Sequence, residues 1–195
     1  MTKQKIVFCR GGVIAEFYKA LVRTYIFPKN APNIDVTSYG TATNSLGFPK
    51  YYLSSKYGSL LKGKETEFEV FLCYDKESVI FNQISSECWK DIGNDLLETF
   101  DNISVTHIVH VNSIEDWFLA DIDGLSSLFN RKIDFPNTSG REFIKKYYQD
   151  NERTYVSSNE SQCKELISML NIKKIIEANM CTLIPLLKTD KFCEK

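Results

Sequence analysis

The stretch Phe68-Glu-Val-Phe-Leu-Cys-Tyr74 is the most apolar of four short runs in this sequence that favour β-structure. The other three runs are residues 5–9, 34–39 and 103–111. A strand inside a parallel sheet is covered on both faces, so it reads as a nearly continuous apolar run. We therefore expect residues 68–74 to form an interior strand.

A helical pattern follows each of the four predicted strands. In the first pattern, apolar side chains recur at helical spacing; they are Ile14, Phe17, Tyr18, Leu21 and Tyr25. The other patterns cover residues 49–61, which Pro49 can open, 87–100, and 114–129, which Gly124 interrupts. Strands that alternate with helices indicate an α/β fold, here a mostly parallel sheet of about four strands with helices on both faces.

The sequence divides into two parts at a polar stretch. Residues 1–130 carry the strand and helix patterns of an α/β domain, and residues 130–140, with Pro136 and Gly140, resemble a linker. The remainder, residues 141–190, shows helical patterns at 141–149, 160–170 and 172–187. We expect Pro185 to bend or end the last helix. This helical C-terminal extension is expected to pack on the same domain.

Composition excludes several classes of protein. The 195 residues are 43% hydrophobic and 25% charged, so the chain can bury a core, and disorder or a collagen-like repeat is excluded as a description of the whole. The net charge of −1 excludes a polycation that coats nucleic acid. The six cysteines form no CxxC pair and there is no secretory or membrane-spanning apolar segment. We expect reduced thiols, a cytoplasmic location and no membrane partner.

Acidic side chains follow three of the predicted strands. Glu16 lies beyond the first strand, Asp75 and Glu77 follow the third, and Glu115 follows the fourth. In open α/β sheets, ligands bind beyond the carboxyl ends of the strands. Clustered carboxylates repel one another, and a divalent cation such as Mg²⁺ removes that cost. These four residues are therefore a candidate metal site.

Some of these residues also have simple structural explanations. Asp75 and Glu77 fit an exposed turn, and on spacing alone we favour that interpretation. Ser113 and Asp116 fit a capping box at the start of a helix, which we prefer for Asp116. Glu115 projects differently and is freer to serve a site. His107 and His110 lie three apart in a strand, so they face opposite sides, and we expect neither to bind metal.

Two stretches are candidates for contact with phosphate. Arg10-Gly11-Gly12 lies before a helix, where backbone N–H groups can cradle an anion, although a tight turn explains the glycines equally well. Basic and aromatic residues mix between 141 and 153, a combination that can bind a nucleic-acid backbone. They are Arg141, Lys145, Lys146, Tyr147, Tyr148 and Arg153. A solvated helix face is the commoner explanation for such a mixture.

Three segments resemble Toprim domains of the RloB-like and OLD-nuclease-like kind. They are Ile6-Val-Phe-Cys-Arg-Gly-Gly12 followed by Glu16-Phe-Tyr18, the segment 68–77, and Asn112-Ser-Ile-Glu-Asp-Trp-Phe-Leu-Ala-Asp121. The third segment is the most specific, because it is similar to the Glu-x-Trp-Leu-Leu-Ala-Asp stretch of RloB-like proteins. Order and spacing match over roughly residues 4–130.

The resemblance implies a Toprim fold and Mg²⁺- or Mn²⁺-dependent nicking or cleavage of nucleic acid, in defence against phage or mobile elements. It implies that Asp75 and Glu77 stand for the family's D-x-D pair. Glu115 stands for the Glu before Trp, and Glu16 for the acid on the first helix. Glu16, Asp75 and Glu115 are thus the implied catalytic residues, and with Glu77 the implied metal ligands.

The sequence departs from the family pattern at two places. Arg10 stands where the family has a Glu, and Arg can serve neither as general base nor as metal ligand. The D-x-D pair is D-x-E. Either Glu16 substitutes in an active nuclease, or the domain is non-catalytic and binds nucleic acid, a nucleotide or a partner ATPase, with Arg10, Gly11 and Gly12 holding a phosphate. DNA or RNA as ligand, and a homo-oligomer, stay open.

Overall fold

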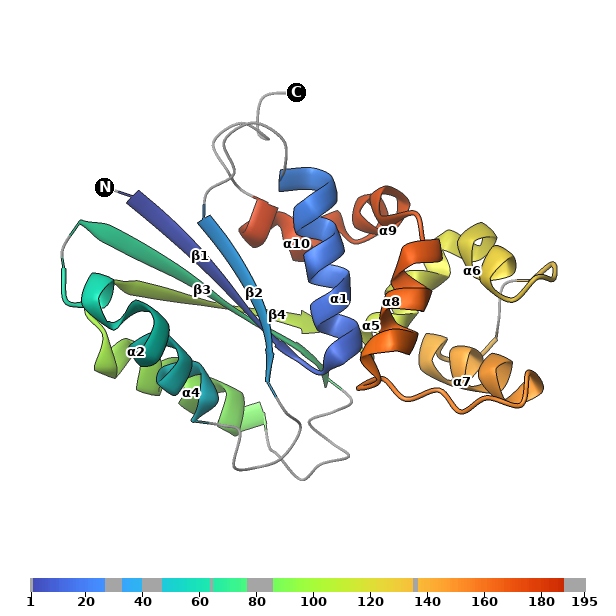
Figure 1. Ribbon diagram of the computed structural model, residues 1–195, viewed down its shortest axis with the longest axis horizontal. Coiled ribbons are helices and arrows are strands. Elements are labelled where there is room, and N and C mark those ends of the chain that lie inside the picture. Colours follow the sequence, from blue (N-terminus) through green and yellow to red (C-terminus); the bar gives the residue numbers. More distant parts are fainter. Residues whose placement is uncertain are drawn as a thin grey trace.

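The computed structural model describes residues 2–26, 33–39, 47–63, 65–76, 86–134 and 137–187. Its centre is a four-stranded sheet in which every pairing is parallel and the strand order is β2-β1-β3-β4 (Figure 1). The strands are β1 Thr2–Arg10, β2 Asn33–Tyr39, β3 Thr66–Asp75 and β4 Ile103–His110. The predicted parallel α/β sheet is therefore confirmed, and residues 68–74 lie in an interior strand.

The two interior strands are apolar because both of their faces are covered. Val7 of β1 lies opposite Val36 of β2 and Phe71 of β3, and Cys9 lies opposite Cys73. Successive strand residues point to opposite faces. Val7 and Phe71 consequently belong to one core and their neighbours to another, so the sheet separates two hydrophobic layers.

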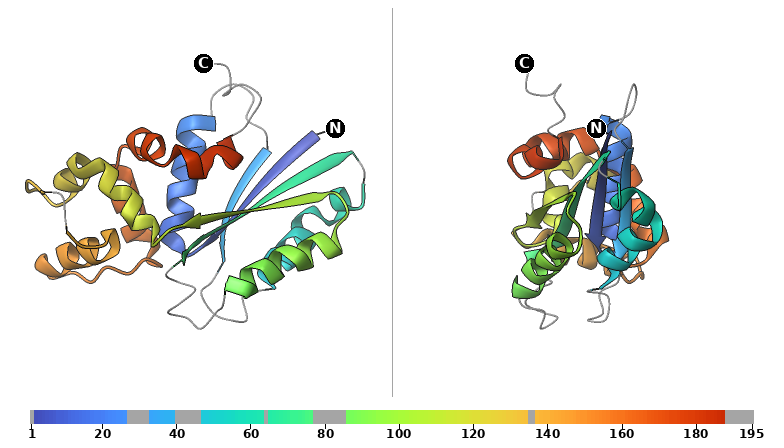
Figure 2. Two further views of the ribbon diagram at one scale, coloured as in Figure 1. Left: turned by 180° about the vertical axis from the view of Figure 1, so that it is seen from behind. Right: turned by 90° about the vertical axis from the view of Figure 1, so that its left-hand side faces the viewer.

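Helices cover both faces of the sheet, as the alternating pattern predicts (Figure 2). Helix α1, Gly12–Leu21, packs on one face with the C-terminal helices. Helices α2, Phe48–Leu61, and α4, Ser86–Thr99, lie on the other face, over Phe8 and Leu72. The first helix is shorter than expected, because after Leu21 the chain continues as a π-helical turn, Val22–Ile26.

The helical pattern at 114–129 is not one helix. It forms α5, Ile114–Phe118, a 3₁₀ turn at Leu119–Asp121, and α6, Ile122–Leu128. The sequence predicted an interruption at Gly124, whereas the break lies earlier, at Leu119–Asp121. A tertiary contact accounts for the position, because the Asp121 carboxylate accepts a hydrogen bond from the Asn171 backbone N–H, 2.7 Å away.

The described part of the C-terminal extension, up to residue 187, contains four helices. They are α7 Gly140–Asp150, α8 Glu160–Met169, α9 Ile172–Ala178 and α10 Met180–Leu187. The predicted helix at 172–187 is broken at Asn179, and Pro185 lies inside α10. Ile144, Leu166 and Leu183 share one core with α1, so the extension packs on the α/β domain. No helix in the described ranges is both long enough and apolar enough to cross a membrane.

Candidate acidic site at the carboxyl ends of the strands

Asp75 is the last residue of β3 and is almost fully buried. Its Oδ1 accepts a hydrogen bond from the backbone N–H of Ile114, at 2.8 Å, and lies 2.8 Å from His110 Nδ1. The carboxylate therefore joins the end of β3 to the end of β4 and to the first residue of α5. Carboxylates with this many partners lie at ordered, low-dielectric positions, where each contact counts for more than in water.

His110 extends this network to the first helix. Its ring is fully buried, and Nε2 lies 3.2 Å from the hydroxyl of Tyr18 on α1. The edge of the ring meets Trp117, with ring centroids 4.7 Å apart. Burial raises the pKa of Tyr18 well above its usual value, so the hydroxyl stays protonated. His107 contacts Tyr74 instead, so the two histidines are held by different partners.

Arg141 of α7 lies between two carboxylates. Its Nη2 is 2.5 Å from Asp75 Oδ2 and 3.3 Å from Glu115 Oε2. Glu115 is fully buried, and its Oε1 accepts a hydrogen bond from the Tyr155 hydroxyl at 3.0 Å. A buried carboxylate without a cation carries a large desolvation cost. Arg141 therefore supplies the positive charge that the sequence analysis assigned to a metal ion.

A close backbone approach fixes the position of Arg141. A Cβ atom at Gly140 would overlap the backbone of Glu115 and Asp116, so only glycine lets α7 approach α5 this closely. The Gly140 N–H donates to the Asp116 carboxylate, which favours the positive N-terminal end of α7. Ser113 is the N-cap residue of α5, as predicted, but its side chain makes no cap hydrogen bond, so the capping box itself is wrong. Asp116 supports α7 rather than its own helix.

A second arginine is buried near the same carboxylate. Arg10 ends β1, opposite Tyr39 of β2, and is 5% exposed. Burial lowers the pKa of Arg10, whereas the charges of Tyr39 and Asp75 act in the opposite direction. A guanidinium stays protonated even so. Arg10 and Arg141 therefore both place positive charge at this acidic edge of the sheet.

Glu16 has a different environment from the other predicted ligands. It is buried on α1 and forms an ion pair with Lys19 at 2.8 Å. Tyr18 faces His110, and two residues along a helix turn the side chain by about 200°, so Glu16 lies on the other side of α1. Asp75 and Glu115 thus share Arg141, whereas the ion pair of Glu16 is with Lys19.

The described residues contain no group of three or more His, Cys, Asp or Glu side chains that could hold a metal ion. Glu77, the fourth predicted ligand, lies outside the described residues. Carboxylates prefer hard cations such as Mg²⁺ or Mn²⁺, and Asp75 and Glu115 are the two that meet. Arg141 would have to leave before a metal ion could bind both of them.

The Gly11-Gly12 turn brings two backbone segments together. Gly11 has φ of 100°, in the left-handed region that favours glycine. A Cβ atom at Gly12 would lie 3.2 Å from the carbonyl oxygen of Ser157, which accepts a hydrogen bond from Val13 N–H at 3.0 Å. One N–H group of the first helical turn is therefore already used within the protein. The tight-turn interpretation accounts for both glycines.

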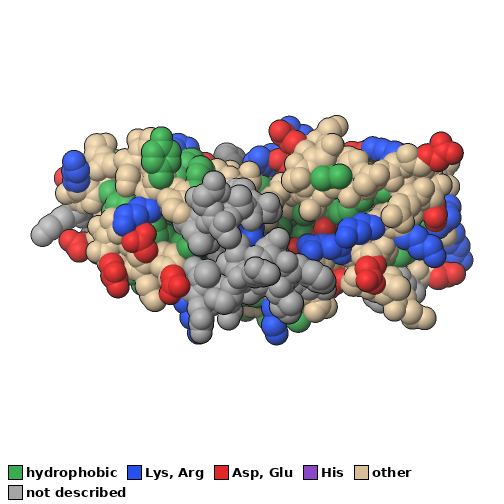
Figure 3. Space-filling view, turned by 90° about the horizontal axis from the view of Figure 1, so that it is seen from below, with side chains coloured by type: hydrophobic (Ala, Val, Ile, Leu, Met, Phe, Trp, Pro, Cys, Tyr) green, Lys and Arg blue, Asp and Glu red, His purple; other side chains and the backbone are tan. Residues whose placement is uncertain are grey.

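The basic and aromatic residues between 141 and 153 separate into two groups. Tyr147 and Tyr148 are buried, and Tyr147 stacks on Phe129 with ring centroids 4.0 Å apart, so these rings face the core. Lys145 and Lys146 are exposed on α7. Viewed from below, Lys and Arg side chains gather over this helical half of the molecule (Figure 3). Only the charged group is accessible to a nucleic acid.

Sequence reasoning missed three members of the site. His110 was assigned no role, Arg141 was placed only in a basic stretch, and Tyr155 was not singled out. Arg141 is 66 residues from Asp75 along the chain, so no local spacing links them. The position of His110 at the end of β4 was the one usable signal. Comparison of the chain with family models, with curated proteins and with solved structures found no match.

Proposed function

We propose that this protein is a non-catalytic module that binds nucleic acid, with arginine in place of a metal ion in its acidic site. The observation that carries the proposal is the position of Arg141 between Asp75 and Glu115. Each carboxylate also has a neutral partner, Ile114 N–H for Asp75 and the Tyr155 hydroxyl for Glu115. Both carboxylates therefore have hydrogen-bond donors, and one guanidinium offsets part of their negative charge without a divalent cation.

The accessible charges on α7 support nucleic acid as the ligand. Lys145 and Lys146 are exposed next to one another, and within the described part of the chain neither is engaged in an ion pair. Ammonium groups on a helix surface contact phosphates as point charges and carry no sequence information. With a net charge of −1 for the whole chain, binding should be modest and strongly reduced by salt.

The test is fluorescence anisotropy with single-stranded DNA, single-stranded RNA and duplex DNA at several salt concentrations. Lys145→Gln combined with Lys146→Gln should weaken binding and reduce the salt dependence by about 1 to 2 released counterions. The matched control combines Lys62→Gln with Lys173→Gln, which removes the same charge from exposed positions elsewhere. An equal loss of affinity in both double variants would contradict the assignment. So would the absence of saturable binding by the wild-type protein.

A metal-dependent nuclease is the second candidate. The observation that favours it is that Asp75 and Glu115 come together from β3 and α5, as the strand-end argument predicts. In that function Arg141 would have to withdraw, and Asp75 and Glu115 would hold Mg²⁺ or Mn²⁺, which would orient and stabilise the reacting phosphate; the resemblance adds Glu77 as a further ligand. By resemblance alone, an ATPase partner and a role in phage defence go with either candidate.

A cleavage assay separates the two candidates. Supercoiled plasmid, single-stranded DNA and RNA are incubated with Mg²⁺, with Mn²⁺ and with chelator. Cleavage that needs metal and is lost in Asp75→Asn and in Glu77→Gln, both checked for folding by circular dichroism, would overturn the non-catalytic proposal. We expect no cleavage by the folded wild-type protein.

A further inference from the structure

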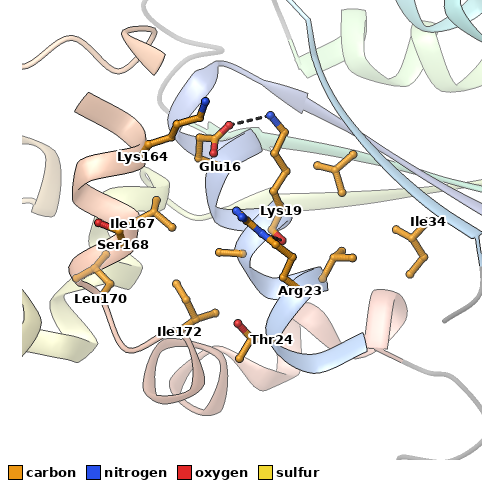
Figure 4. A pocket seen from close by; sticks show the side chains of 13 residues that line it. Glu16, Lys19, Arg23, Thr24, Ile34, Lys164, Ile167, Ser168, Leu170 and Ile172 are labelled. Atoms are coloured by element: carbon orange, nitrogen blue, oxygen red, sulfur yellow. Dashed lines mark hydrogen bonds and ion pairs between the residues drawn. The ribbon is translucent and has the colours of Figure 1, made fainter. Parts of the chain in front are cut away.

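A groove of about 880 Å³ lies between α1, β2, α8 and α9 (Figure 4). Its apolar side is formed by aliphatic side chains from three of these elements, namely Ile34, Val36, Ile167, Leu170 and Ile172. Its polar side carries three cations, Lys19, Arg23 and Lys164, and the hydroxyls of Thr24 and Ser168. The volume lies in the range of small-molecule sites, which combine apolar walls with a few polar groups.

The groove has an excess of positive charge. Three cations line it against one acid, Glu16, which pairs with Lys19 at 2.8 Å. Lys164 pairs with Glu160 at 2.5 Å, and Glu160 is not among the residues that line the groove. Figure 4 shows Lys164 and Lys19 on either side of Glu16. With Glu16 and Glu160 both counted, the set keeps one net positive charge, which an anionic ligand would balance.

Arg23 is the cation best placed to receive that ligand. Its Nε donates to the backbone oxygen of Lys19 at 3.2 Å, and no carboxylate among the described residues forms an ion pair with it. The hydrogen bond with Glu160 raises the pKa of Lys164, whereas the positive charge of Arg23 opposes that rise. The two cations therefore repel one another across the groove. An anion between them would relieve this repulsion.

The backbone at Arg23 is unusual. Val22, Arg23 and Thr24 line the groove from the π-helical turn that follows α1. Single π-turns are rare and occur frequently at functional sites. The turn is a second feature, independent of charge, that sets this groove apart.

We propose that the groove binds a nucleoside polyphosphate. The phosphates lie against Arg23, Lys19 and Lys164, and the base and sugar lie on the aliphatic side, with Ser168 and Thr24 available for hydrogen bonds. Inorganic phosphate alone would leave most of 880 Å³ and the apolar wall unused. A fatty acid has a single carboxylate and no further polar group for the hydroxyls of Thr24 and Ser168. The proposal does not depend on nucleic-acid binding, because Lys145 and Lys146 lie outside the groove.

Isothermal titration of the whole protein with ATP, ADP, adenosine and pyrophosphate tests the proposal. We expect saturable binding of ATP, with pyrophosphate and adenosine each bound at least about tenfold more weakly. Arg23→Gln should weaken ATP about tenfold by removing charge-assisted hydrogen bonds. Ser168→Trp, an exposed position, should fill the groove and abolish binding of the nucleoside part. Lys173→Gln, exposed on α9 outside the groove, is the control and should bind as wild type does.

Three results would overturn the proposal. One is the absence of ATP binding at millimolar concentration by protein whose melting temperature is normal. Another is pyrophosphate binding equal to that of ATP and unaffected by Ser168→Trp, which would show a plain anion site. The third is ATP binding that Arg23→Gln leaves unchanged. Because Arg23 and Ser168 are both exposed, neither substitution should prevent folding.

Discussion

Replacement of Arg141 by methionine tests whether this cation compensates for buried negative charge at the acidic site. Methionine keeps most of the length of the side chain and removes its charge. Asp75 and Glu115 are 3% and 0% exposed, so neither carboxylate can turn to water when the guanidinium is removed. Breaking a buried ion pair by removing one partner costs about 3–5 kcal/mol.

Removal of the guanidinium leaves the two carboxylates with few hydrogen bonds. Asp75 keeps the Ile114 N–H and His110, whereas Glu115 keeps only the Tyr155 hydroxyl among the bonds described above. We therefore expect a loss of about 3–5 kcal/mol in the free energy of unfolding. For a chain of this size that lowers the melting temperature by roughly 6–20 °C.

Urea denaturation of wild type and Arg141→Met at neutral pH measures this loss. Arg153→Met is the matched control, because Arg153 forms its ion pair with Glu165 at the surface, where such pairs contribute about 1 kcal/mol or less. Adding Glu115→Gln to Arg141→Met should recover part of the loss, since the uncompensated charge is removed. A loss below about 1 kcal/mol for Arg141→Met would refute the reasoning.

Three further substitutions test other parts of the structure. Burial raises the pKa of Asp35, but hydrogen bonds from Lys56 and two tyrosines outweigh it and lower the pKa below its ordinary 3.8. The ionised Asp35 carboxylate therefore stabilises the folded protein above pH 3.8, and this stabilisation is lost as the pH falls through the lowered pKa. Urea denaturation should show that Asp35→Asn destabilises the protein at pH 7 and does so much less at pH 3. Gly140→Ala should cost about 1–3 kcal/mol, because its Cβ overlaps the backbone of Glu115, and a melting temperature equal to wild type would contradict the close approach. Gly58→Ala has open space inside α2 and should stabilise by about 0.5–1 kcal/mol in the same melting experiment.

The sheet could be predicted from sequence because each strand is a contiguous run of residues that favour β-structure, with its own local signal. The meeting of Asp75 and Glu115 could also be predicted, since the strand-end rule uses only the order of elements. The break at Leu119–Asp121 could not, because it depends on a contact between Asp121 and Asn171. That contact exists only in the folded chain.

The ion pair of Glu16 was within reach of sequence reasoning, because Lys19 lies three residues further along the same helix. The role of Arg141 was not within reach. It depends on how closely α7 approaches α5, which the absence of a Cβ atom at Gly140 permits.

The many partners of Asp75 have a consequence for the evolution of this chain. One carboxylate is in contact with residues of β4, α5 and α7, and through His110 it reaches α1. Selection for a folded chain alone would retain an acid at this position, even after any chemistry had been lost. Persistence of this aspartate in related sequences would therefore be no sign that they cut nucleic acid, and inactivity of an Asp75 variant would identify a ligand only where folding is shown to survive.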